Sequence, residues 1–255
     1  MEEKIFYNSM NNKLCGIIKS ANNNKVVIMC HGIRSNKEEC GSFSYLAKRL
    51  NEEGYSSFRF DFNGHGESSG NDLDFSISSA IIDLKNTIKM LKEKGYSEFI
   101  LLGASFGASI VSMFPYQDYN CIKGIILWFG ALNHNCIKIG NLFSDENKKI
   151  AEENGFYISK SINTGKEFKF GLELFNEVDE YKPYEYLKKL NLPKLFVHGK
   201  ADSVVPYKIS EEVSKMCNSS KLELIENGEH SFKNSKDALE NAVDVTVKFV
   251  KEVLK

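Results

Sequence analysis

The stretch FILLGASFGASIV, residues 99–111, decides how this sequence folds. An apolar run typical of a strand, EFILLG, leads directly into Gly-x-Ser-x-Gly around Ser105, and a helical start, ASIVSMF, follows. Gly103 and Gly107 permit the sharp strand-to-helix turn that lifts a serine hydroxyl above the end of a strand. The stretch therefore predicts a nucleophilic Ser105 at the carboxyl end of a buried strand.

The same spacing recurs in GESSG, residues 66–70, around Ser68. This second match extends a glycine-rich loop, NGHGESSGND, with no strand immediately before it and no apolar helix immediately after it. The motif has meaning only between a strand and a helix. We therefore interpret Ser68 as a loop residue without a catalytic role.

Short β-branched and aromatic runs alternate with longer amphipathic stretches along the rest of the chain. The strand candidates are KIFYN, LCGIIKS, KVVIMC, YSSFRFDF, EFILLG, IKGIILWF, KLFVHG and KLELIE. Apolar residues at helical spacing predict helices at 77–91 and 236–254. This alternation predicts an α/β fold, with a mostly parallel sheet of about eight strands, helices on both faces, and the first two strands as an antiparallel edge hairpin.

Residues 131–184 break the alternation. A charged helical piece, SDENKKIAEENG, ends at Gly155, and FYISKSINTGKEFKFG forms two alternating segments around Asn-Thr-Gly-Lys, typical of a hairpin. We expect one domain, 1–255, with a cap inserted at about 131–184. The cap aromatics Phe156 and Phe168 could line an apolar pocket, as could Trp128 at the end of IKGIILWF, although core packing is the alternative for all three.

Composition excludes several classes of protein. The 33 basic and 34 acidic side chains give a net charge of -1 and form no basic stripe, so no nucleic-acid partner is expected. The start, MEEKIFYNSMNNK, does not resemble a secretory signal, and we expect the mature protein to begin here. The longest apolar stretch, residues 124–132, is far short of the ~20 residues that span a bilayer. Six scattered cysteines indicate reduced thiols and a cytoplasmic location.

A serine nucleophile needs a base and a group that orients the base. The chain order Ser, acid, His selects His230, after KLELIE, and Asp202, after KLFVHG, from the five histidines and many acids. His198 closes a strand and is expected to make structural hydrogen bonds, and His134 is expected on the cap surface. Three acids fit the third role less well by position: Glu226, Glu229 and Asp61.

Acyl transfer also requires donors for the oxygen that becomes negative. The amide of Phe106, directly after the serine, is one candidate. The amide of Ile33, in the loop HGIRSN after KVVIMC, is the other. No His/Cys/Asp cluster has metal-ligand spacing, so neither a metal nor another cofactor is expected.

Five motifs in this order resemble the α/β-hydrolase superfamily, in the branch that holds cinnamoyl (feruloyl) esterases, monoacylglycerol lipases and serine aminopeptidase-like proteins. They are CHGIRSNK, FRFDFNGHGESSG, LLGASFGAS, HGKADSVVP and ENGEHSF, and the resemblance covers nearly the whole chain. It implies that Ser105 attacks, His230 moves the proton, Asp202 orients His230, and the Ile33 and Phe106 amides hold the oxyanion. It also implies that His65 and Gly66 are structural.

The resemblance implies a serine esterase that acts on a small-molecule ester with a short-chain or aromatic acyl group, since FRFDFNGHGES is most similar to the cinnamoyl esterases. The cap sequence does not match theirs. The alternatives are a monoacylglycerol or lysophospholipid lipase, a serine aminopeptidase with an acidic anchor at Glu152, Glu153 or Glu173, and a receptor that keeps the fold without turnover. The sequence does not indicate an oligomeric state.

Overall fold

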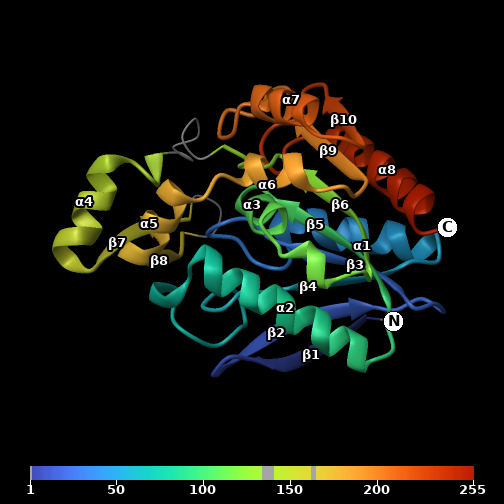
Figure 1. Ribbon diagram of the computed structural model, residues 1–255, viewed down its shortest axis with the longest axis horizontal. Coiled ribbons are helices and arrows are strands. Elements are labelled where there is room, and N and C mark those ends of the chain that lie inside the picture. The colour runs from blue at the N-terminus through green and yellow to red at the C-terminus, as the bar shows by residue number, and fades with distance from the viewer. Residues whose placement is uncertain (1, 134–140, 162–164) are drawn as a thin grey trace.

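The computed structural model describes residues 2–133, 141–161 and 165–255. One eight-stranded sheet runs through the molecule in the order β1-β2-β4-β3-β5-β6-β9-β10 (Figure 1). The pairs β1–β2 and β2–β4 are antiparallel, and every other pair is parallel. Each predicted strand is present, and the edge hairpin is confirmed. The strands are β1 Glu2–Ser9, β2 Asn12–Lys19, β3 Lys25–Cys30, β4 Ser56–Phe60, β5 Glu98–Ala104, β6 Ile122–Trp128, β9 Lys194–Gly199 and β10 Ser220–Ile225.

Helices cover both faces of the sheet, so the predicted α/β fold is confirmed. Side chains alternate along a strand, and β5 accordingly sends Phe99 and Leu101 to one apolar core and Ile100 and Leu102 to the other. The helices over the first core are α2 Ile77–Glu93, α3 Phe106–Ser112, α6 Pro183–Lys189 and α7 Tyr207–Met216, and those over the second are α1 Ser42–Glu52 and α8 Lys236–Val253. Short 3-10 turns occur at η1 Glu39–Gly41, η2 Asp72–Asp74 and η3 Tyr116–Asp118.

Within the segment 131–184, the elements formed by residues 145–160 and 167–180 lie beside the main sheet, at the left of Figure 1. The described elements of this segment are α4 Asp145–Asn154, β7 Phe156–Lys160, β8 Glu167–Gly171 and α5 Leu172–Glu180. The predicted hairpin is confirmed, because β7 and β8 pair antiparallel, and α4 ends at Gly155 as predicted. His134, Cys136 and most of the hairpin turn lie outside the described residues.

Glu177 of α5 connects this segment to the N-terminus of α2. Its carboxylate accepts hydrogen bonds from the amides of Ile77 at 2.5 Å and Ser78 at 3.1 Å, at the N-terminus of α2. Those amides have no partner inside the helix, and the helix dipole there favours a negative charge. The buried Glu177 therefore satisfies the start of α2 while it fixes the position of α5.

Two further findings concern the described residues. The thiols at 15, 30, 40, 121 and 217 form no disulfide bonds. No helix in these ranges is both long and apolar enough to cross a membrane.

Candidate active site

Ser105 lies between β5 and α3, on the turn that the motif predicts. Its backbone has φ 53° and ψ -117°, a conformation that L-residues rarely adopt. A Cβ on Gly107 would lie 2.2 Å from the carbonyl oxygen of Cys30, so α3 can approach β3 this closely only with glycine there. The turn thus holds the Ser105 hydroxyl at the carboxyl end of the sheet.

The structure brings Ser105, His230 and Asp202 together from three loops. His230 follows β10, and its Nε2 lies 3.1 Å from Ser105 Oγ. Its Nδ1 lies 2.7 Å from Oδ2 of Asp202, in the loop after β9. Both distances allow hydrogen bonds. A proton can therefore pass from the serine to His230 while Asp202 orients the ring.

Asp202 is held as a carboxylate. Burial by itself would raise its pKa, but hydrogen bonds from His198 and His230 outweigh burial and hold the pKa below the usual range of an aspartate. The backbone amides of Val204 and Val205 donate to Oδ1 at 2.8 and 2.9 Å. These fixed donors keep Oδ2 turned toward His230.

His198 is buried next to Asp202, a proximity that sequence reasoning missed. Its Nε2 lies 2.9 Å from the carbonyl oxygen of Val205 and 3.3 Å from Asp202 Oδ2, and its Nδ1 lies 2.7 Å from Ser210 Oγ. The expected structural hydrogen bonds are present. The available signal was the separation of four residues between His198 and Asp202, across the end of β9.

The loop after β3 lies against the serine. A Cβ on Gly32 would be 3.1 Å from Ser105 Cβ, and Ile33 lines the cavity beside the hydroxyl. Phe106 follows Ser105 directly and is the first residue of α3, so its amide lies at the N-terminal end of that helix. The assignment of the Ile33 and Phe106 amides to the oxyanion remains a prediction.

The cavity at Ser105 has a volume of about 280 Å³, and most of the residues that line it are of polar or charged type. Its described apolar side chains are only Ile33 and Val204, whereas four charged ones are present besides His230. The lining residues are Gly32, Ile33, Arg34, Ser35, Glu39, Ser105, Ser161, Ser203, Val204, Glu229, His230, Ser231, Lys233 and Asn234.

Glu39 and Arg34 are site residues that sequence reasoning did not identify. Glu39 is only 5% exposed, and its Oε2 accepts a hydrogen bond from the Gly32 amide at 2.8 Å. Burial raises its pKa, in part offset by that bond. Its neighbour Glu38 instead pairs with the buried side chain of Arg59 at 3.3 Å. Nothing in the run NKEE distinguishes the two glutamates, because the difference arises from the turn of η1.

The predicted pocket residues lie elsewhere, and this corrects the sequence interpretation. Trp128 is fully buried on the α8 side of the sheet, where its Nε1 donates to Thr246 Oγ1 at 2.9 Å. Phe168 is buried against His65, with ring centroids 5.1 Å apart. Phe156 lines a separate hollow between α4 and β7. Because side chains alternate along β6, Trp128 lies on the α8 face of the sheet and does not reach the Ser105 cavity. Phe156 and Phe168 contribute to the packing of the segment 131–184 instead.

The competing groups are engaged in other contacts. Ser68 Oγ donates to the carbonyl oxygen of Asp61 at 2.6 Å and accepts from the Cys15 amide at 2.9 Å. The Asp61 carboxylate is buried and pairs with Lys37 at 2.8 Å. Glu226 pairs with Lys200. Neither of these acids is bonded to His230, whose partner is Asp202.

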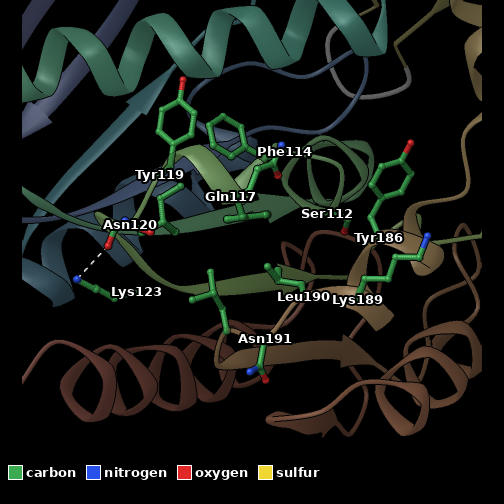
Figure 2. Close-up of a pocket in the computed structure, with 13 residues that line it drawn as sticks. Ser112, Phe114, Gln117, Tyr119, Asn120, Lys123, Tyr186, Lys189, Leu190 and Asn191 are labelled. Carbon is green, nitrogen blue, oxygen red and sulfur yellow. Dashed lines mark hydrogen bonds between the residues drawn. The ribbon is translucent and has the colours of Figure 1, made fainter.

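A larger cavity, about 630 Å³, is drawn in Figure 2. Its lining includes Ile122 and Lys123 at the start of β6, and Leu192 just before β9. Parallel strands bring their amino ends to one edge of the sheet and their carboxyl ends, with Ser105, to the opposite edge. A cavity larger than the one at Ser105 therefore lies at the opposite edge of the sheet. No group of three or more His, Cys, Asp or Glu side chains in the described ranges could hold a metal ion.

Comparisons with known proteins show which family the chain belongs to. A model of the serine aminopeptidase S33 family matches residues 21–152, and a model of the serine hydrolase family FSH1 matches residues 95–242, each more than half of the 255 residues. The chain belongs to the serine hydrolases of the α/β-hydrolase superfamily.

Individual relatives of this serine hydrolase are distant. The uncharacterized protein YfhR of Escherichia coli O157:H7 is 23% identical over 188 residues, which cover 72% of this chain and only 56% of YfhR. Human serine hydrolase BPHL is 23% identical over 200 residues, covering 74% of this chain and 68% of BPHL. The structure of Est1E from Butyrivibrio proteoclasticus superimposes with a TM-score of 0.79 at 21% identity, over 98% of both chains. The structural likeness supports the fold alone.

Proposed function

We propose that this serine hydrolase cleaves carboxylic esters through an acyl-enzyme on Ser105. The observation that carries the proposal is the chain of contacts from Ser105 Oγ to His230 to Asp202, at a strained strand-to-helix turn. His230 Nε2 takes the Ser105 proton as Oγ attacks the carbonyl carbon, and then returns it to the departing alcohol. Water, deprotonated by His230, next releases the acid and restores the serine.

The Ile33 and Phe106 amides are proposed to bind the oxygen that becomes negative in each tetrahedral intermediate. Loss of one such donor slows other serine hydrolases by about 100- to 1000-fold. Asp202 stabilises the imidazolium of His230 when the ring carries the extra proton. It acts as a positioning residue, since it does not touch the substrate.

The cavity supports a short acyl group. Its volume of about 280 Å³ suits a small ester better than the long channel that a monoacylglycerol lipase needs. An aromatic acyl group is the second candidate, because the structural neighbour Est1E has been solved with ferulic acid. The three aromatic residues first expected at the pocket do not line this cavity, which favours the short-chain ester.

The test is a set of initial rates on p-nitrophenyl esters of rising chain length and on methyl ferulate, with Ser105→Ala as the blank. We expect the highest kcat/KM for acyl groups of two to four carbons. Faster turnover of methyl ferulate would favour the aromatic esterase, and faster turnover of long chains the lipase. If amides but no ester react, the peptidase alternative replaces the proposal, and absence of all turnover supports a receptor.

A further inference from the structure

The guanidinium of Arg34 is the unexplained group in the Ser105 cavity. Arg34 follows Ile33 directly, so it adjoins the amide assigned to the oxyanion. Its Nη1 reaches across to β7, where it donates to Ser159 Oγ at 2.9 Å and, at 3.5 Å, to the carbonyl oxygen of Lys160. The side chain thus lies between the oxyanion loop and the segment 131–184, at the cavity wall.

Most of the donors of Arg34 are unused. Within residues 2–133, 141–161 and 165–255, no carboxylate lies within ion-pair distance of the guanidinium, and its Nε and Nη2 have no hydrogen-bond acceptor. The side chain is half-buried, and arginine stays charged at any physiological pH. The unbonded Nε and Nη2 are not fully buried, so an anion in the cavity can reach them. The planar fork of donors matches a carboxylate.

The acids in the cavity do not neutralise Arg34. Glu39 is bound to the Gly32 amide, and Glu229 accepts a hydrogen bond from the Asn234 side chain. Asp202 is bound to His230. The backbone of Arg34 is also an outlier, with φ 59° in the region that favours glycine. Such outliers concentrate at functional sites.

We propose that the Ser105 cavity binds esters that carry a carboxylate, and that Arg34 is the residue that binds this carboxylate. The inference rests on the proposed ester hydrolysis and adds the substrate class to it. The carboxylate would lie in either the acyl group or the alcohol, a few carbons from the ester carbonyl that Ser105 attacks. Arg34 acts in this proposal as a specificity residue outside the Ser105–His230–Asp202 group.

The experiment compares matched esters in which a terminal methyl is replaced by a carboxylate. For the acyl side these are p-nitrophenyl valerate and p-nitrophenyl hemiglutarate, and for the alcohol side ethyl butyrate and carboxymethyl butyrate. A charge-assisted hydrogen bond predicts a preference for the anionic ester of about ten- to a hundredfold in kcat/KM, mostly through KM. In Arg34→Gln the ratio of anionic to neutral kcat/KM should fall to about one on the preferred arm.

Lys160→Gln is the matched control, because it removes an exposed cation of the same region and should leave the ratio unchanged. Turnover of the neutral esters without any anionic preference on either arm would overturn the inference while the proposed function stands. A preference that survives in Arg34→Gln would also overturn it.

A second measurement requires neither hydrolysis of an ester nor a folded Arg34 variant. Calorimetric titration of Ser105→Ala with glutarate should detect binding at least tenfold tighter than with glutaramide, and added salt should weaken it. If no ester is hydrolysed by the wild type, the proposed function fails, and this titration still decides whether the cavity binds a carboxylate. Equal binding of the two compounds contradicts the assignment of Arg34.

Discussion

Ser105 and Ser68 share the spacing Gly-x-Ser-x-Gly, but their hydroxyls meet different groups. The hydroxyl of Ser105 lies 3.1 Å from the nitrogen of His230, above a turn between a strand and a helix. The hydroxyl of Ser68 lies between two backbone groups, of Cys15 and Asp61, in a loop at the end of β4. The pentapeptide permits a tight turn in both places, and only the elements on either side determine whether the serine meets a base.

The glycines of the two motifs also have different neighbours. A Cβ on Gly107 would collide with the backbone of β3 at 2.2 Å, because the helix must approach the sheet. A Cβ on Gly66 would collide, also at 2.2 Å, with the carboxyl group of Asp61, which Lys37 neutralises. In the first case glycine permits the close approach of α3 to the sheet beside Ser105, and in the second it permits a buried ion pair.

The largest expected effect separates the two serines by activity. Ser105→Ala should lower kcat by about a million-fold, since no other group can form the acyl-enzyme. Ser68→Ala should keep kcat within about threefold, because its hydroxyl contacts only the backbone. Both rates are measured on the best p-nitrophenyl ester, with thermal unfolding to show that each variant is folded. Retention of most activity in Ser105→Ala would remove the basis of the proposed mechanism.

The next effect concerns the acid that serves Ser105. Asp202→Asn should lower kcat by about 10⁴-fold, because the amide favours the wrong tautomer of His230 while the geometry is preserved. Glu226→Gln is the control, since Glu226 pairs with Lys200 and should not affect the rate. A loss of tenfold or less in Asp202→Asn would assign the third role to another acid.

The sequence predicts the Ser105 region well because its signals are local. A strand, a glycine-flanked serine and a helix occur in one stretch, and the chain order then indicates Asp202 and His230. Eight strands were recognisable because buried strands consist of short β-branched runs. In each of these cases the physical requirement lies within a few neighbouring residues.

The cavity wall could not be predicted in the same way. Arg34 and Glu39 belong to a polar run, HGIRSNKEE, and only the path of the loop turns them toward Ser105. Trp128 closes an apolar strand, and a change of one position in the alternation decides between pocket and core. These outcomes depend on contacts between distant segments, which one-dimensional patterns do not record.

A smaller expected effect is the pH dependence of stability that arises from His65, in the same loop as Ser68. His65 is buried, and burial first, then the charge of His31, lowers its pKa from 6.5 to about 3. Its Nδ1 lies 3.0 Å from the carbonyl oxygen of Asn63, and no described group pairs with Nε2. The depressed pKa means that the unfolded chain binds a proton that the folded chain does not. Stability is therefore complete above pH 6.5 and is lost as the pH falls toward 3.

The measurement is the free energy of unfolding by urea between about pH 8 and pH 5. His65 alone should account for a loss of about 2 kcal/mol by pH 5. His65→Gln, which retains a donor for the Asn63 carbonyl, should have a flatter profile by that amount. Parallel profiles for the two proteins would mean that His65 is not the group that titrates.

The smallest effect isolates what the Ser68 hydroxyl contributes. Ser68→Ala leaves the Cys15 amide and the Asp61 carbonyl without their partner in a half-buried loop, which should lower the free energy of unfolding by about 1 to 2 kcal/mol. Ser69→Ala is the matched control, since Ser69 Oγ accepts only the Lys13 amide at 2.8 Å in an exposed position and water can replace it. Its cost should stay near 0.5 kcal/mol. If Ser68→Ala proves as mild as Ser69→Ala, the glycines of GESSG, and not its serine, are what this loop requires.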